Sequence, residues 1–189
     1  MKHNSSEPAA APGGNSAESA AVPSGSLAGP AAAPCGNGAE SAAAPGGVRR
    51  GELATSASRG NLARVWDFAQ GYLERLRPSD RERMGVELAM EEIFINIASY
   101  AYADGHEGAV TVRCEADQAA GRLTVTFIDG GAPYNPLERG DPDTDLALRE
   151  RPIGGLGIFM AKRLMDAMDY RYENGENILA LVKHVAGRG

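Results

Sequence analysis

The sequence predicts an α+β domain in which about three helices cover one face of a mixed, mostly antiparallel sheet. Apolar residues recur at helical spacing in 61–77 and 79–102, and strand-like alternating segments come in consecutive pairs farther along the chain. Consecutive strands form antiparallel hairpins, and a helix that is apolar on one side needs a surface to cover. The expected architecture is therefore a two-layer α/β sandwich.

The chain divides by composition into two parts. Residues 1–48 are rich in Ala, Gly and Pro and contain no aromatic residue, and the stretch 9–23 returns in similar form at 31–45. Such a segment buries too little apolar surface to offset the entropy lost on ordering, so we expect a disordered low-complexity tail. Residues 49–189 have the size of one domain and contain every aromatic residue of the chain.

Composition also argues against several classes of protein. The formal net charge is -6 and the chain has no basic stripe, which argues against direct nucleic-acid binding. No apolar run approaches the roughly 18 residues of a membrane span, and no apolar segment of a secretory signal follows Lys2 and His3. Cys35 and Cys114 give neither a metal-ligand spacing nor a disulfide framework. We therefore expect a cytoplasmic protein without membrane contact.

Two long helices are expected first. The helix over 61–77 ends at Pro78, and Ser79 with Glu82 forms the capping box of a helix that runs to about Tyr102. The apolar positions of the first helix are Leu62, Val65, Trp66, Ala69, Leu73 and Leu76. Those of the second are Val86, Ala89, Met90, Ile93 and Ile97.

Strands and loops fill the rest of the domain. The segments 110–116 and 122–129 form one expected hairpin, and Asn174-Gly175 is the turn of a second. Between them lie a long polar loop at 137–152 and a helix at about 155–168 that opens on glycines. A short strand is also expected near Glu52–Thr55.

Three stretches carry residues suited to chemistry. Glu92 and Asn96 are four residues apart and share a helix face; the alternative to a functional pair is a solvated polar stripe. A carboxylate and an amide oxygen suit Mg²⁺ with phosphate, and a partly desolvated Glu can act as a general base. Asp129 ends an apolar strand and precedes two glycines, which also suits an ordinary turn. The glycines of GGLG at 154–157 precede a helix, where backbone N–H groups can hold phosphate, although a flexible hinge or a close packing contact also needs glycine.

The order of these stretches resembles that of the GHKL, or Bergerat-fold, ATPases. ELAMEEIFINIASYAY resembles the N box of that superfamily, IDGGAPYNP its G1 box and RPIGGLGIFMAKRLMD its G2 box. The nearest group is the bacterial anti-sigma-factor serine/threonine protein kinases, and the resemblance covers essentially all of 52–185.

The resemblance implies a role for each position. Glu92 is the general base that prepares a serine hydroxyl, and Asn96 coordinates Mg²⁺. Asp129 accepts a hydrogen bond from the adenine amino group, with Gly131 beside the ring. The lid over ATP is 137–153. The remaining candidate nucleotide contacts are Ala132, Pro133, Ile153, Gly154, Gly155, Leu156 and Gly157, and Arg151, whose alternative is a solvated loop side chain.

Three positions depart from the family pattern. Ile153 replaces a glycine of the fuller G2 box, Tyr100 stands where a His is common, and Asn177 stands where many relatives carry a Thr close to the nucleotide. None of these changes removes the base or the metal ligand.

The resemblance implies a function and partners. We expect a protein kinase that uses ATP and Mg²⁺ to phosphorylate a serine on a STAS-domain anti-anti-sigma protein, and that binds a sigma factor as its alternative partner. A homodimer is implied as well. The alternative is an ATP-gated protein-binding module without phosphotransfer activity.

Overall fold

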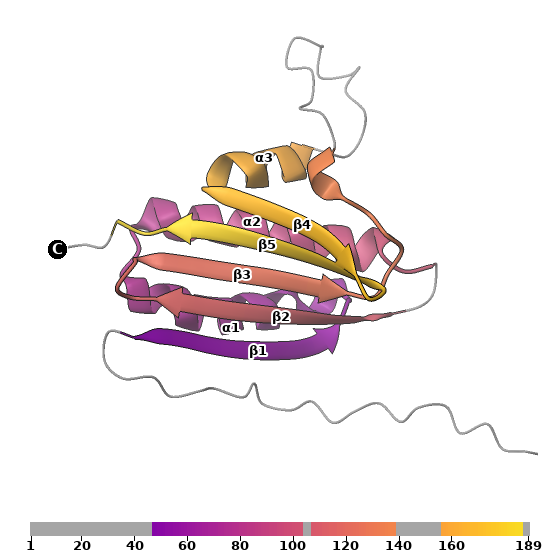
Figure 1. Cartoon of the computed structure of the whole chain (residues 1–189), viewed down its shortest axis with the longest axis horizontal. Helices are drawn as coiled ribbons and strands as arrows, with labels where there is room; N and C mark the ends of the chain where they lie inside the picture. Colours follow the sequence, from indigo (N-terminus) through magenta and orange to yellow (C-terminus); the bar gives the residue numbers. More distant parts are fainter. Residues whose placement is uncertain (1–46, 104–106, 139–155, 187–189) are drawn as a thin grey trace, which may run out of the picture. The chain divides into compact units, whose positions relative to one another are not determined.

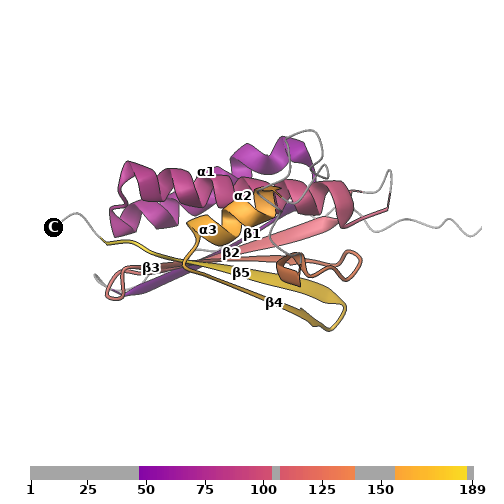
Figure 2. The same ribbon diagram turned by 90° about the horizontal axis from the view of Figure 1, so that it is seen from above.

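The computed structural model describes residues 47–103, 107–138 and 156–186, which form one sheet with helices on one side of it (Figures 1 and 2). The strands are β1 (Val48–Ser56), β2 (Ala109–Asp117), β3 (Arg122–Asp129), β4 (Ala167–Glu173) and β5 (Glu176–His184). The α-helices are α1 (Leu62–Leu73), α2 (Asp80–Tyr100) and α3 (Leu156–Leu164). Short 3-10 helices lie at η1 (Arg59–Asn61), η2 (Glu74–Leu76) and η3 (Pro136–Glu138).

The five strands follow the order β1-β2-β3-β5-β4, and every neighbouring pair is antiparallel. The expected two-layer architecture and both hairpins are confirmed. The expected mixture of strand directions does not occur among the described strands, because α1 and α2 return the chain to β2 in the direction opposite to β1. The strand expected near Glu52–Thr55 is the longer edge strand β1, which begins at Val48, the last residue of the predicted tail.

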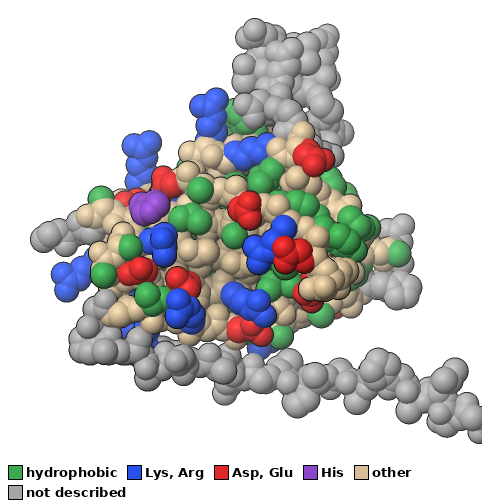
Figure 3. Space-filling model, in the orientation of Figure 1, with side chains coloured by type: hydrophobic (Ala, Val, Ile, Leu, Met, Phe, Trp, Pro, Cys, Tyr) green, Lys and Arg blue, Asp and Glu red, His purple; other side chains and the backbone are tan. Residues whose placement is uncertain are grey.

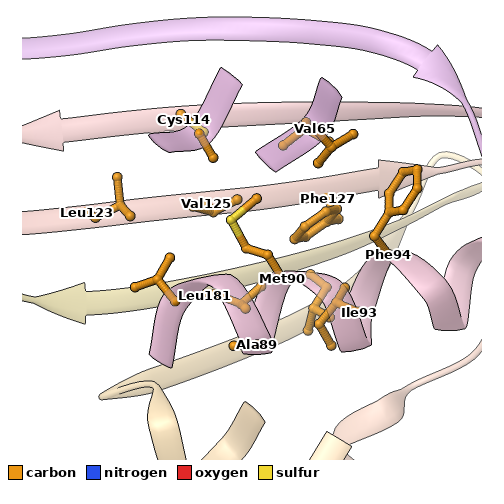
Figure 4. Packing of buried hydrophobic residues seen from close by; sticks show 14 of the residues in the cluster. Val65, Ala89, Met90, Ile93, Phe94, Cys114, Leu123, Val125, Phe127 and Leu181 are labelled. Atoms are coloured by element: carbon orange, nitrogen blue, oxygen red, sulfur yellow. The ribbon is translucent and has the colours of Figure 1, made fainter. Parts of the chain in front are cut away.

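The hydrophobic core lies between the helices and the sheet. Figure 4 shows Met90 and Phe94 of α2 close to Val125 and Phe127 of β3. All five apolar residues predicted for the second helix are buried: Val86, Ala89, Met90, Ile93 and Ile97. This packing places one face of α2 against the sheet, so the neighbouring face is held at a fixed position beside the ends of β3 and β5.

The first helix differs from its prediction in which aromatic residue it buries. Trp66, predicted as core, is half-buried, whereas Tyr72 is buried against β1. A Cβ at Gly51 would overlap the Tyr72 hydroxyl, so this glycine makes room for the tyrosine ring. The helix also ends earlier, at Leu73, and Arg77 in a left-handed conformation with φ 55° closes the 3-10 turn that follows.

Local interactions set the ends of the other two helices. The predicted capping box is present, since the Ser79 side chain accepts from the Glu82 backbone N–H at 3.3 Å and Glu82 accepts from the Ser79 N–H at 2.7 Å. Helix α3 ends at Leu164 instead of about 168, because strand β4 already begins at Ala167. Among the described residues, no helix combines the length and the apolar character of a membrane span.

The sheet face turned away from the helices is the face seen in Figure 3, where charges of both signs are interspersed. Arg50 of β1 pairs with Glu115 of β2 at 2.6 Å, and Arg113 of β2 pairs with Glu52 of β1 at 2.5 Å. Exposed ion pairs of this kind contribute about 0–1 kcal/mol each, so the helix-covered face contributes most of the burial energy.

Candidate functional site

A cavity of about 630 Å³ lies between α2, the loop after β3, the start of α3 and the ends of β4 and β5. Pockets that hold small organic ligands have volumes of roughly 300–1,000 Å³. Seven of the predicted site residues line this cavity: Glu92, Asn96, Asp129, Ala132, Pro133, Leu156 and Gly157. Arg151, Ile153, Gly154 and Gly155 fall outside the described residues.

Glu92 and Asn96 lie one turn apart on α2 and both line the cavity. The helix face beside them is packed on the sheet through Ile93 and Ile97, which fixes the direction of the two polar side chains. Both side chains are half-buried, and neither makes a hydrogen bond or ion pair within the part of the chain that the structure describes. Their polar atoms therefore remain available to a molecule in the cavity.

Gly157 lies in the first turn of α3, directly against Glu92. A Cβ at this position would overlap the Glu92 carboxylate, so only glycine permits this approach of the two helices. A helix N-terminus carries a partial positive charge that favours a nearby carboxylate or phosphate. The glycine predicted to make room for phosphate thus also makes room for the predicted base.

Asp129 ends β3 and is 6% exposed. Its Oδ1 accepts hydrogen bonds from the Gly131 N–H at 3.0 Å and from Asn177 Nδ2 at 2.9 Å. Burial raises the pKa of this carboxyl above its usual value, and these two hydrogen bonds offset part of the rise. No hydrogen bond reaches Oδ2 from the described residues, so an acceptor atom of Asp129 remains free at the cavity wall.

Asn177 on β5, which the sequence singled out only as a departure from the family pattern, is a component of the site. It is 6% exposed, lines the cavity and pairs with Asp129 in the sheet register. The alternation of β5 turns Asn177 inward together with Leu179 and Leu181. A polar residue at such a position needs hydrogen-bond partners, and this signal was present in the sequence.

The loop after β3 is fixed to the end of α2. The Ala132 N–H donates to the Ala101 carbonyl oxygen at 2.9 Å, and the Gly130 N–H donates to the Tyr102 hydroxyl at 3.1 Å. Gly131 is buried, and a Cβ there would overlap the Ala101 carbonyl. Gly131 is absent from the residues that line the cavity, and its place beside the ring stays a prediction.

Other candidates lie away from the cavity. His184 is exposed at the end of β5, while His106 lies outside the described residues. Cys114 is buried in β2, and burial raises the pKa of its thiol far above the usual value. Within the described residues no group of three or more His, Cys, Asp or Glu side chains is placed to hold a metal ion.

The chain belongs to the histidine kinase-like ATPase domain family, whose sequence profile it matches over residues 55–183. The family resemblance inferred from the three boxes is thereby confirmed. The chain is 29% identical over 135 residues to the serine/threonine-protein kinase BtrW of Bordetella bronchiseptica, an alignment that covers 71% of this chain and 92% of BtrW.

A solved structure has a similar fold. The crystal structure of the RsbU and RsbW domains of Rv1364c from Mycobacterium tuberculosis superposes with a TM-score of 0.50 at 16% sequence identity. The match covers 73% of this chain and 33% of that chain, so this chain spans about a third of the larger protein. At this identity the likeness shows the fold alone.

Proposed function

We propose that the chain is an ATP-dependent serine/threonine protein kinase whose nucleotide binds in the cavity between α2 and the loop after β3. The observation that carries the proposal is that one cavity is lined by two separate sets of polar side chains, each suited to a different part of a nucleotide. The buried carboxylate of Asp129 lies in one part of it, and Glu92 and Asn96 lie in another; among the described residues, Asp129 Oδ2 and both of these side chains have no hydrogen-bond partner.

Asp129 supplies the contact to the base. An acceptor oxygen in a largely apolar wall recognises an amino group such as that of adenine, and the cavity leaves Oδ2 free for this bond. Ala132 and Pro133 form the neighbouring wall, and the anchored backbone of this loop holds them in place.

Glu92, Asn96 and the start of α3 act on the phosphates and the acceptor. Glu92 takes the proton of a serine hydroxyl while the serine oxygen attacks the γ-phosphorus, so a P–O bond forms to serine and the bond to ADP breaks. In this proposal the backbone N–H groups of Leu156 and Gly157, in the first turn of α3, bind phosphate oxygens.

Asn96 fits a role in holding Mg²⁺. Magnesium is usually bound by one or two protein groups together with substrate phosphates and water, so an amide oxygen beside a carboxylate is a suitable donor set even without a larger acidic cluster. When bound, the ion would neutralise phosphate charge, and the Asn96 side-chain oxygen would be one of its ligands.

The expected partner is a STAS-domain anti-anti-sigma protein that carries the acceptor serine, with a sigma factor as the alternative partner. This part of the proposal follows from the family resemblance, and the similarity to a protein named as a serine/threonine kinase supports it. The chain would then regulate transcription by exchanging one partner for the other.

A second candidate function is a nucleotide-gated binding module without phosphotransfer. It is favoured only if the Glu92 carboxylate serves to position the first turn of α3, with which it is in direct contact. The two functions differ in one measurable product, phosphoserine on the partner.

The test is the intact mass of a STAS-domain protein encoded beside this one, after incubation with the full chain and Mg-ATP. We expect a gain of one phosphoryl group with the wild type, and a rate about 10²–10⁴-fold lower with Glu92→Gln. ATP affinity should stay unchanged, because Gln keeps the size of Glu. Glu91→Gln is the matched control, since Glu91 is exposed on the same helix and absent from the cavity lining.

Two results would contradict the assignment. Equal rates for Glu92→Gln and the wild type would exclude Glu92 as the base. Failure of wild-type transfer to the STAS-domain partner, with ATP binding confirmed in the same sample, would favour the binding module.

A further inference from the structure

The Asn177 side chain forms hydrogen bonds with Ala132 and Tyr134, in the loop that precedes η3, and with the carboxylate of Asp129. Its Nδ2 donates to Asp129 Oδ1 at 2.9 Å and to the Ala132 carbonyl oxygen at 3.1 Å. Its Oδ1 accepts from the Tyr134 backbone N–H at 3.1 Å and from the Tyr170 hydroxyl at 2.7 Å. Both amide hydrogens and both acceptor positions of the side chain are therefore in use.

The partners fix the orientation of this amide. A backbone N–H can only donate and a backbone carbonyl can only accept, so Oδ1 must face Tyr134 and Nδ2 must face Ala132. In that orientation Nδ2 also reaches Asp129 Oδ1, on the neighbouring strand. Rotation of the amide by half a turn would place donor against donor at Tyr134 and acceptor against acceptor at Ala132.

We propose that Asn177 is a positioning residue that determines recognition of the base. It holds Asp129 by Oδ1, so that Oδ2 is the oxygen presented to the cavity, and it ties residues 132–134 to β5 in the same arrangement. Since all of its own hydrogen-bonding groups are in use, it acts through Asp129 and makes no polar contact with the nucleotide. This inference rests on the proposed function, namely that Asp129 accepts from the amino group of adenine.

The experiment compares the affinities of the full chain for two probes, ATP and purine riboside 5′-triphosphate, which carries hydrogen in place of the amino group. We expect the wild type to bind ATP more tightly than the analogue by a factor on the order of ten, the usual effect of a hydrogen bond to a charged group. In Asn177→Ala the ratio should fall close to one, chiefly through weaker ATP binding, because Asp129 is no longer held.

A matched control separates positioning from general loss of structure. Asn61 is a half-buried Asn at the start of α1 that donates to the Ser56 carbonyl oxygen and hydroxyl at 3.1 and 2.8 Å. Asn61→Ala should lower the melting temperature while leaving the ATP-to-analogue ratio at the wild-type value. Tyr170→Phe, a milder change, removes only one of the bonds to Asn177 Oδ1 and should give an intermediate ratio.

The outcomes are distinguishable. A wild-type ratio in both Asn177→Ala and Tyr170→Phe would overturn the positioning role while leaving the ATP site intact. Equal affinity of the wild type for the two probes would overturn the Asp129 contact and this inference with it. If the wild type bound neither probe, the proposed function itself would fail. If Asn177→Ala does not fold, the ratio of Tyr170→Phe decides the matter.

Discussion

The two ends of the cavity are built in opposite ways. At the end formed by Asp129 and Asn177, hydrogen bonds connect β3 with β5, and connect the loop after β3 with both β5 and the C-terminal end of α2. At the end formed by Glu92, Asn96 and the first turn of α3, the functional side chains make no hydrogen bond to any described residue. The first end is therefore preorganised, whereas the second offers free polar groups to whatever binds there.

This difference has a physical origin in the elements that carry each end. Strands β3 and β5 are central in the sheet and pair along their whole length, so a carboxylate at their end is buried and has to be satisfied by neighbours. Glu92 and Asn96 stand at the border of the face that α2 packs on the sheet, where both side chains are only half-buried and need no partner among the described residues. Changes at the two ends should consequently separate binding of the base from transfer of phosphate.

After Glu92→Gln, Gly157→Ala should produce the largest effect and test the comparison most directly. The added Cβ overlaps the Glu92 carboxylate, so either the carboxylate or the start of α3 must move. A displacement of about 1 Å can lower a rate about 100-fold, and we expect a loss of that order in phosphotransfer to the STAS-domain protein, with ATP affinity changed far less.

The control for this substitution is Gly71→Ala. Gly71 is exposed in α1 with nothing within 4 Å of an added Cβ, so the change should leave the rate unaltered and stabilise the helix slightly. Equal rates for Gly157→Ala and the wild type would mean that contact between Glu92 and α3 does not matter for catalysis.

Asp129→Asn should act at the other end and reduce ATP affinity by about 10–100-fold, as measured by calorimetry. Asn can still accept at Oδ1 from Gly131 and Asn177, but its amide group then turns a donor towards the adenine amino group. Asp169→Asn, on an exposed position of β4, is the matched control. Undiminished ATP binding by Asp129→Asn would remove the base contact from this end of the cavity.

The smallest effect is on stability and depends on pH. Burial raises the folded-state pKa of Asp129 above its unfolded value near 3.8, so between the two values the folded state keeps a proton that the unfolded state has released. The free energy of unfolding therefore falls as pH rises through this window, and at neutral pH the protein bears the full cost of burying the ionised carboxylate. Asp129→Asn should have the higher melting temperature at pH 7, and the difference should vanish below about pH 3.8.

Asp166 provides a control, because its pKa is shifted in the direction opposite to that of Asp129. Burial opposes its ionisation, but hydrogen bonds from the His184 backbone N–H and from Lys183 outweigh this and lower its pKa. The contribution of this carboxylate to stability is fully present above its unfolded-state pKa near 3.8 and is lost as pH falls through its folded-state pKa. Asp166→Asn should therefore have the lower melting temperature at neutral pH. If the melting temperatures of Asp129→Asn and Asp166→Asn changed in the same direction at neutral pH, the opposite pKa shifts of the two carboxyl groups would be contradicted.

Sequence patterns predicted most elements because their signals are local. The capping box at Ser79, the apolar spacing from Val86 to Ile97 and the turn at Asn174-Gly175 each depend on residues within a few positions of one another. Element ends were less accurate, as at the early end of α1, because the 3-10 turn that follows closes at Arg77, a non-glycine residue in a left-handed conformation that residue type does not signal.

The sequence by itself determined the family, the order of the three boxes and the candidate pairs Glu92–Asn96 and Asp129–Gly131. Only the tertiary structure placed Gly157 against Glu92, packed Gly131 against Ala101 and connected Asn177 to Asp129. Residues 129 and 177 are separated by 48 positions and meet only because β3 and β5 pair in one register. Local sequence patterns predict the element in which a residue lies and the chemistry of its side chain, whereas the register of the sheet decides which distant residues come into contact.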